Sequence, residues 1–199
     1  MRTSQKHLRH LMVLEKRRMG EGTESKMNAT IPAPSGTRIA LGIDPGTAIV
    51  GYAVVMARGS ELQLLVCDAI TTPAKMPLAE RLQLIYAGLS TIVATHKPQE
   101  AAMEELFFAK NARTAMTVGQ ARGVAMLALA NGGLSIAEYT PKQVKQAVTG
   151  YGSAGKSQVG EMVRILLKLS ATPKPDDAAD AAAVAICHLN TASYARALA

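Results

Sequence analysis

The chain has 199 residues, of which 48% are hydrophobic and 19% are charged, and its formal net charge is +7. This composition predicts one globular domain with an appendage and excludes a wholly disordered chain. No run approaches the roughly 20 apolar residues that cross a bilayer, so we expect no membrane partner. The two cysteines lie far apart and form no zinc or disulfide pattern, which favours the reducing cytoplasm.

Basic residues are concentrated near the N-terminus. Residues 1–38 carry eight Lys or Arg against three Glu, whereas the rest of the chain has a net charge of only +2. Two prolines and a glycine in residues 29–36 then discourage regular structure. We therefore expect a basic, disordered extension over residues 1–37 and a folded domain over residues 38–199. The extension is either a mobile arm or sequence that precedes a later start at Met19 or Met27.

The folded part opens with three β-rich segments separated by turns. They are Arg38–Ile43, Val50–Met56 and Leu62–Ile70, and Asp44-Pro45-Gly46-Thr47 has the composition of the first turn. Short connections of this kind predict an antiparallel meander.

Helical and strand patterns alternate after the meander. In order, they are a helix over Leu78–His96, a strand over Ala101–Leu106, a helix over Arg113–Ala130 and a strand over Leu134–Tyr139. Three helices follow, over Lys142–Val148, around Val159–Leu167 and over Asp177–Ala195, and Thr140-Pro141 begins the first of them. This order predicts an α/β fold with a mixed sheet and helices on its faces.

Four acidic residues occupy positions where burial is costly. Asp44 follows an apolar strand, Glu104 lies in a short strand, and Asp177 and Asp180 open an alanine-rich helix. The last two lie three residues apart on one helix face, where like charges repel, and no Lys or Arg follows until Arg196. A divalent cation would relieve this repulsion, and oxygen ligands favour Mg²⁺ or Mn²⁺.

The topology predicts that these acids meet. Strands joined by helical crossovers run parallel, so the strands ending near Asp44, Leu106 and Tyr139 present their carboxyl ends at one sheet edge, where open α/β sheets bind ligands. Carboxylates gathered there can hold two metal ions about 3.5 to 4 Å apart, an arrangement that cleaves phosphodiesters by activating water and stabilising the leaving oxygen.

Spacing alone leaves alternatives open for each acid. Asp44 could cap its turn, and Asp177 could cap its helix. The ligand is also ambiguous between Glu104 and Glu105, because neighbours in a strand face opposite sides, and between Asp176 and Asp177.

Residues 150–157 match the Walker A pattern of nucleotide triphosphatases, with Lys156 as its lysine. A P-loop follows a strand, however, and the preceding segment carries helix-start signals at Thr140-Pro141. The loop is then either a holder of a DNA phosphate or a plain surface loop. Residues 42–47 also resemble the first turn of actin-like ATPases, but the chain is too short for their two lobes.

Six blocks together resemble the RuvC family of Holliday-junction resolvases over about residues 38–192. They are Leu41-Gly42-Ile43-Asp44-Pro45-Gly46-Thr47, residues 104–111, Gly119-Gln120-Ala121-Arg122-Gly123, Lys142-Gln143-Val144-Lys145, Lys156-Ser157-Gln158-Val159 and Asp177-Ala178-Ala179-Asp180. The resemblance implies a ribonuclease H-like five-stranded sheet, a homodimer, and Mg²⁺-dependent paired nicking of four-way DNA junctions in recombination and repair. It also implies a branch-migration helicase partner in the same pathway.

The same resemblance implies roles for particular residues. Two Mg²⁺ ions, which Mn²⁺ could replace, would be held by the four acids Asp44, Glu104, Asp177 and Asp180. Lys145 and Lys156 would act in catalysis near the scissile phosphate. Glu105 stands where Gln is common in the family, which adds negative charge beside the site.

Several further residues are candidates for DNA contact. By the resemblance, Phe107 would stack on junction bases, although Phe108 beside it leaves open which ring meets DNA. We also expect Lys110, Arg113 and Arg122 to face DNA, together with Lys145 and Lys156. The alternative for the first three is a solvated helix face with no DNA contact. His188, two helical turns after Asp180, is either a metal-site neighbour or a core residue. A junction-binding protein without catalysis is the remaining alternative function.

Overall fold

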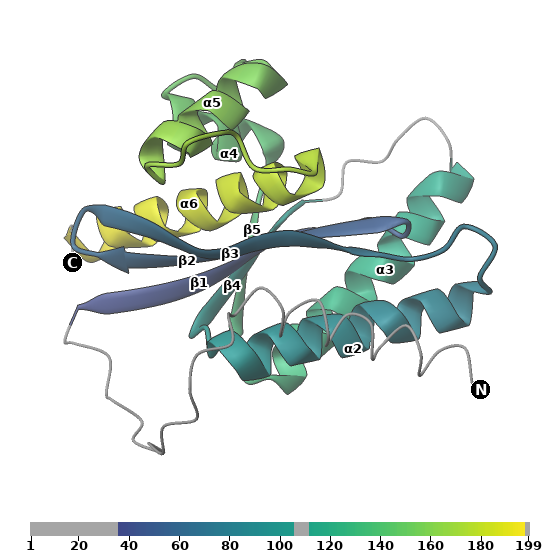
Figure 1. Ribbon diagram of the computed structural model, residues 1–199. Coiled ribbons are helices and arrows are strands. Elements are labelled where there is room, and N and C mark those ends of the chain that lie inside the picture. Colours follow the sequence, from purple (N-terminus) through teal and green to yellow (C-terminus); the bar gives the residue numbers. More distant parts are fainter. Residues whose placement is uncertain (1–35, 106–111, 198–199) are drawn as a thin grey trace.

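The chain forms a five-stranded mixed sheet between two layers of helices (Figure 1). This computed structural model describes residues 36–105 and 112–197. The strands are β1 (Thr37–Asp44), β2 (Ile49–Arg58), β3 (Glu61–Thr71), β4 (Glu100–Glu104) and β5 (Ser135–Tyr139). The helices are α2 (Leu78–His96), α3 (Ala112–Asn131), α4 (Pro141–Thr149), α5 (Lys156–Leu166) and α6 (Asp176–Ala197). The elements predicted from sequence are confirmed, and most bounds differ by only one or two residues.

The strand order across the sheet is β3-β2-β1-β4-β5. β1, β2 and β3 pair antiparallel, which confirms the meander, whereas β1, β4 and β5 are parallel neighbours. Because helices α2 and α3 supply the crossovers, β1, β4 and β5 end at the same edge of the sheet. Asp44, Glu104 and Tyr139 are the last residues of those three strands.

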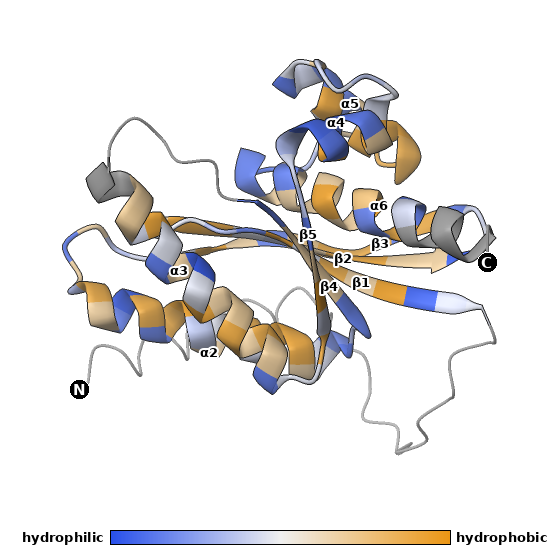
Figure 2. Cartoon of the chain, turned by 180° about the vertical axis from the view of Figure 1, so that it is seen from behind, coloured by the Kyte–Doolittle hydropathy of each residue, from blue (hydrophilic) through white to orange (hydrophobic). Residues whose placement is uncertain are grey.

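Side-chain alternation along β1 divides the core between the two faces. Leu41 and Ile43 pack with α2 and α3, whereas Ala40 and Gly42 face α6 and the layer that contains α4 and α5. Figure 2 shows the strands as largely apolar along their buried length. Both faces of the central strands are therefore covered, as parallel sheets require.

Helix α6 lies unusually close to the sheet, and two glycines make this possible. A methyl group built on Gly42 would overlap the carbonyl of Ala181, and one on Gly51 would overlap the carbonyl of Asp177. The facing side of α6 is mostly buried alanine, which lets the helix backbone rest on β1 and β2. The N-terminal turn of α6 is thereby fixed beside the end of β1.

Helices α4 and α5 form a small layer above α6 (Figure 1). Thr140 caps α4 as predicted, because its hydroxyl accepts a hydrogen bond from the Gln143 amide while the Gln143 side chain bonds back to Thr140. Lys156 is the first residue of α5, and the element before its loop is a helix rather than a strand. The structural context of a P-loop is therefore absent at residues 150–157.

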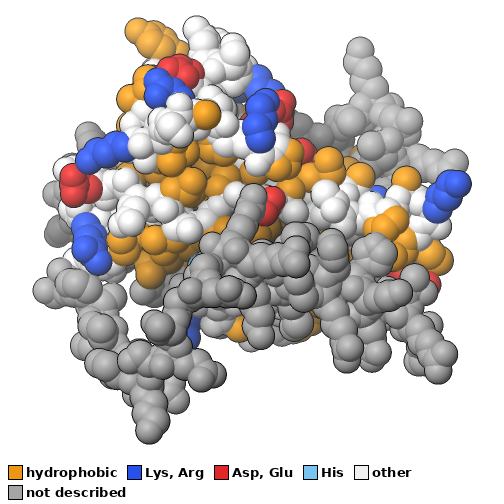
Figure 3. All heavy atoms as spheres, in the orientation of Figure 1, with side chains coloured by type: hydrophobic (Ala, Val, Ile, Leu, Met, Phe, Trp, Pro, Cys, Tyr) orange, Lys and Arg blue, Asp and Glu red, His pale blue; other side chains and the backbone are white. Residues whose placement is uncertain are grey.

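The surface of this layer carries dispersed charge. On the face seen in Figure 3, Lys and Arg side chains of the described residues are scattered around a band of apolar side chains and do not form one patch. None of the helices in residues 36–105 and 112–197 combines the length and apolar character needed to span a bilayer.

Candidate active site

Two of the predicted acids lie side by side at the carboxyl edge of the sheet. The β1–β4 register pairs Ile43 with Met103, so Asp44 and Glu104 are the next residues of adjacent strands. Both side chains fall on the α6 face, because they alternate with Ile43 and Met103, which are buried on the opposite face. Glu105 follows the strand and bonds through its amide to the Tyr139 carbonyl. The geometry thus favours Glu104 over Glu105.

The other two acids reach this edge from the first turns of α6. Asp177 sits where the helix backbone rests on Gly51, and Asp180 lies one turn further along. Asp176, the neighbouring alternative, is exposed and pairs with Lys174 at 2.7 Å. The structure therefore brings together Asp44, Glu104, Asp177 and Asp180, which we call the acid cluster.

The acid cluster is an unfavourable concentration of like charge. Burial, followed by the charges of Asp180, Asp177 and Glu104, raises the pKa of Asp44 to about 7. Burial and then Asp180 likewise raise the pKa of Glu104. The folded chain holds these carboxylates together against their repulsion, so a cation that enters the cluster relieves an existing electrostatic cost.

Lys156 supplies part of the missing positive charge. Its Nζ lies 2.9 Å from Asp180 Oδ2 and 3.8 Å from Asp176 Oδ2, and these contacts raise the pKa of the lysine. Along the chain, no Lys or Arg follows these acids until Arg196. The base comes from another helix instead, because α5 folds back and places its first side chain over Asp180.

Lys145 lies on the same side of the cluster. Burial and Asp180 raise the pKa of Glu104, and the ammonium group of Lys145 offsets part of this rise. A cleft of about 280 Å³ is lined by Lys145 and Lys156 together with Glu104 and Asp180. Two lysines from α4 and α5 thus face two acids from β4 and α6 across one cleft.

The donor chemistry of the cluster fits a hard divalent cation. All four side chains offer carboxylate oxygens, the ligands that Mg²⁺ prefers. Within the described residues, no three Asp, Glu, His or Cys side chains are already at the spacing of a closed metal site. The acids are nevertheless near enough for Asp180, Asp177 and Glu104 to raise the pKa of Asp44, which burial raises most.

Arg122 requires a correction. We expected it to face DNA, but its side chain is only 9% exposed. Its guanidinium donates to the Glu104 carbonyl at 2.5 Å and pairs with Glu138 on β5. Arg122 thus holds the end of β4 from α3. It lies on the face of α3 that packs on the sheet, where the Glu104 carbonyl and the Glu138 carboxylate accept its hydrogen bonds.

The remaining candidates fall elsewhere. Phe107, Phe108 and Lys110 lie outside the described residues, and Arg113 is in the first turn of α3 with a side chain that is not described. His188 is a core residue, since its ring bonds to the Tyr139 hydroxyl at 2.9 Å and to Glu100 at 2.7 Å.

Comparisons with known proteins show the family of the chain. The family model "Crossover junction endodeoxyribonuclease RuvC" matches residues 40–188. The chain belongs to the RuvC family. A RuvC from Chloroflexus aggregans is 59% identical over 153 residues, which cover 77% of this chain and 93% of that protein. A RuvC from Heliobacterium modesticaldum is 58% identical over 149 residues, which cover 75% of this chain and 92% of that protein.

Solved RuvC structures share the fold. Thermus thermophilus RuvC, 35% identical, matches with a TM-score of 0.74, and the same protein in complex with a Holliday junction substrate matches with 0.77. Each match covers 79% of this chain and 96% of the RuvC chain. The yeast mitochondrial Holliday junction resolvase Ydc2, at 13% identity and a TM-score of 0.59, shares the fold. The ribonuclease H-like architecture expected from sequence is confirmed.

Sequence reasoning missed the means by which the acids are brought together. The close approach of α6 depends on Gly42 and Gly51, two positions on neighbouring strands that face one helix. A glycine within each apolar strand, followed much later by an alanine-rich helix, was a usable signal of close backbone packing.

Proposed function

We propose that this RuvC-family enzyme resolves four-way DNA junctions by paired, Mg²⁺-dependent nicking of two strands during recombination and repair. One observation carries the proposal: four acids from β1, β4 and α6 gather at the carboxyl edge of a RuvC-type sheet. The charge that this cluster concentrates is suited to divalent ions beside a phosphodiester, and the family supplies the reaction class.

The acid cluster would hold two Mg²⁺ ions, with Mn²⁺ able to replace them. When bound there, such ions would supply activation of the attacking water and stabilisation of the leaving oxygen. Asp44 and Glu104 hold their side of the site on rigid strands, while Asp177 and Asp180 hold the other on α6. This chemistry needs no protein nucleophile.

The two lysines complete the site. Lys156 and Lys145 present ammonium groups to the cleft that contains Glu104 and Asp180. A phosphate that takes the place of Asp180 as the partner of Lys156 would meet a positive charge where negative charge develops during cleavage. We assign both lysines to catalysis and to DNA contact.

Other DNA contacts and partners stay predictions. Phe107 as a stacking residue, Lys110 and Arg113 as phosphate contacts, the helicase partner and the cytoplasmic location rest on the resemblance and on sequence. So does the division into an extension over residues 1–37 and a nuclease domain over residues 38–199. Arg122 is withdrawn from the DNA contacts, because its guanidinium is committed to β4 and β5.

A homodimer through α3 fits the two equivalent cuts of a junction. The outer face of α3 exposes Met116 at 70% and Leu127 at 53%, with Gly123 between them and open space around it. A glycine flanked by apolar side chains lets two helices approach closely. We expect Leu127→Glu to yield monomers in sedimentation velocity while Leu65→Glu, an exposed leucine on β3, leaves a dimer; a dimeric Leu127→Glu protein would contradict this interface.

The decisive experiment compares a synthetic four-way junction with a linear duplex of equal sequence, with Mg²⁺ or a chelator. We expect symmetric nicks in the junction alone, only with Mg²⁺, and a loss of at least about 10²-fold in Asp44→Asn. Equal cutting of both substrates would leave a nuclease without structure selectivity. Junction binding without cleavage under any condition would make the chain a binding protein, and ATP turnover abolished by Lys156→Ala would revive the nucleotide triphosphatase.

A further inference from the structure

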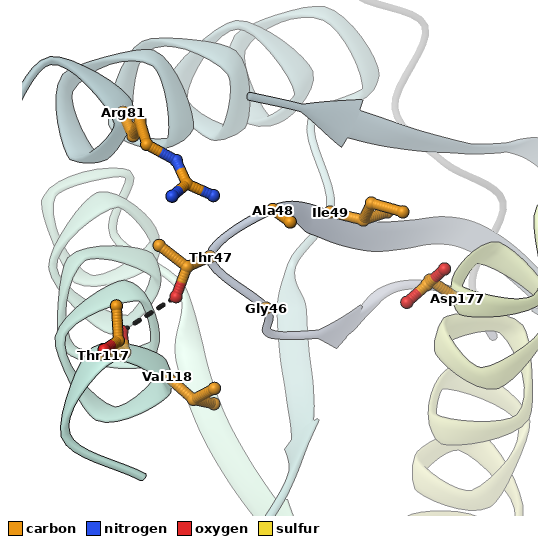
Figure 4. A pocket seen from close by; sticks show the side chains of 8 residues that line it. All are labelled: Gly46, Thr47, Ala48, Ile49, Arg81, Thr117, Val118 and Asp177. Atoms are coloured by element: carbon orange, nitrogen blue, oxygen red, sulfur yellow. Dashed lines mark hydrogen bonds between the residues drawn. The ribbon is translucent and has the colours of Figure 1, made fainter. Parts of the chain in front are cut away.

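A second pocket lies next to the acid cluster, on the other side of Asp177. It has a volume of about 550 Å³ and is formed by the β1–β2 turn, α2, α3 and the start of α6. Asp177 and Arg81 stand at opposite walls, as Figure 4 shows. The pocket therefore shares Asp177 with the acid cluster but has a cationic side of its own.

Arg81 is oriented toward this pocket by a fixed hydrogen bond. Its Nε donates to the Thr72 hydroxyl at 2.8 Å, and that hydroxyl donates to the Thr47 carbonyl at 2.6 Å. Within the described part of the chain, its two terminal nitrogens contact no acceptor, and the guanidinium points at the turn (Figure 4). A half-buried guanidinium with one nitrogen anchored and two directed into a pocket is preorganised for an oxyanion.

The turn beneath Arg81 is held as firmly as the arginine. Thr47 is 8% exposed, and its hydroxyl donates to the Thr117 carbonyl on α3 at 3.0 Å. The Thr72 amide donates to the Ala48 carbonyl at 2.9 Å. These bonds tie the turn after Asp44 to α3 and to the end of β3, so the pocket is a built feature and not a flexible surface loop.

The walls suit a sugar-phosphate chain better than an isolated anion. Ile49 and Val118 present apolar surface, and Gly46 has no side chain to fill the space. An isolated anion would be attracted by Arg81 and repelled by Asp177 in the same pocket. A DNA strand already held at the acid cluster has further phosphates to offer, and its deoxyribose can lie on the apolar wall.

We propose that Arg81 and the pocket over the β1–β2 turn bind a backbone phosphate of the cleaved strand, within a few nucleotides of the cut. This inference rests on the proposed function, because it assumes that the strand passes through the acid cluster. Arg81 would be a positioning residue, which sets the register of the strand while the acid cluster and the lysines perform the reaction.

The test removes one phosphate charge at a time. Four-way junctions with a single neutral methylphosphonate at successive positions around the cut are titrated with wild type, Arg81→Gln and Arg58→Gln, in chelator. Arg58 is an exposed control on β2 that pairs with Thr37, at the opposite end of β1 from Asp44. We expect a methylphosphonate at one position to lower the junction affinity of wild type and Arg58→Gln about tenfold and to leave the affinity of Arg81→Gln unchanged. The slope of log affinity against log salt concentration should be smaller by about 1 for Arg81→Gln than for wild type.

The outcomes separate this inference from the proposed function. Identical methylphosphonate profiles for wild type and Arg81→Gln overturn the role of Arg81, even if wild type resolves junctions normally. A wild type that neither prefers nor cuts junctions overturns the proposed function and this inference with it. Thermal unfolding checks that Arg81→Gln is folded. If it is not, Arg81→Lys replaces it, because this variant keeps the positive charge but loses the two-pronged guanidinium. We expect Arg81→Lys to retain the wild-type salt slope and to lose less affinity than wild type when the methylphosphonate is at that same position.

Discussion

Two parts of α6, its first turns and the turns around His188, cover charged groups that are built from the same elements but follow opposite rules. β1 contributes Asp44 at one end and Arg38 at the other, β4 contributes Glu104 and Glu100, and α6 contributes Asp180 and His188. At the first end, these side chains belong to the acid cluster. At the second, Arg38, Glu100, His188 and Tyr139 form what we call the paired cluster.

In the paired cluster, every charge meets a complementary group. Arg38 donates to Glu100 through Nε at 2.8 Å and Nη2 at 2.6 Å, and His188 bridges Glu100 and Tyr139. These bonds lower the pKa of Glu100 to about 2, Arg38 being the largest cause. In the acid cluster, burial and like charges raise the pKa of Asp44 instead. The paired cluster is thus optimised for stability, whereas the acid cluster retains an electrostatic cost that a ligand can relieve.

The sharpest test of this contrast removes Lys156, whose ammonium group pairs with Asp180 of the acid cluster. We expect Lys156→Ala to lower single-turnover junction cleavage by about 10²-fold, because the ammonium group beside Asp180 is lost from the cleft. Lys168→Ala, which removes an exposed lysine paired with Glu61, serves as the control. Equal rates for the two variants would show that Lys156 only balances charge.

Breaking the paired cluster should cost stability. We expect Glu100→Gln to lower the free energy of unfolding by about 2 kcal/mol at pH 7, because Arg38 keeps a buried charge without its partner. Since the folded pKa of Glu100 lies below its ordinary value of 4.5, its stabilisation is complete above about pH 4.5 and is lost as pH falls toward 2.

Urea denaturation at several pH values measures this. The gap between wild type and Glu100→Gln should narrow as the pH is lowered from 5 toward 2. A gap that stays constant over this range would mean that the Glu100 charge contributes nothing, and that the substitution acts through packing alone.

Neutralising the acid cluster should have the opposite and smaller effect. We expect Asp44→Asn to raise the free energy of unfolding by about 1 kcal/mol in chelator, because it removes one of several repelling, partly buried carboxylates. Mg²⁺ should then stabilise wild type more than Asp44→Asn in thermal unfolding. A destabilised Asp44→Asn protein in chelator would show that the cluster carries no such cost.

The local elements followed from the sequence because their signals are local. Spacings of three and four predicted Leu78–His96 with the bounds that the structure has, and Thr140-Pro141 marked the start of α4. The order of strands and helices also placed Asp44 and Glu104 at one edge, since crossover connections leave few topologies. Spacing alone nevertheless left Glu104 or Glu105, and Asp176 or Asp177, open as the candidate acids.

Only the tertiary structure decided which groups face those acids. Lys156 reaches Asp180 because α5 folds over α6, Arg122 turns inward to the end of β4, and Arg81 points into a pocket formed by four separate elements. Composition and spacing describe neighbours along the chain, whereas the electrostatics of a site depends on distances between segments far apart in sequence. The sequence alone therefore determined the elements and narrowed the acids to adjacent pairs, while packing of α6 on Gly42 and Gly51 determined the arrangement of charge around them.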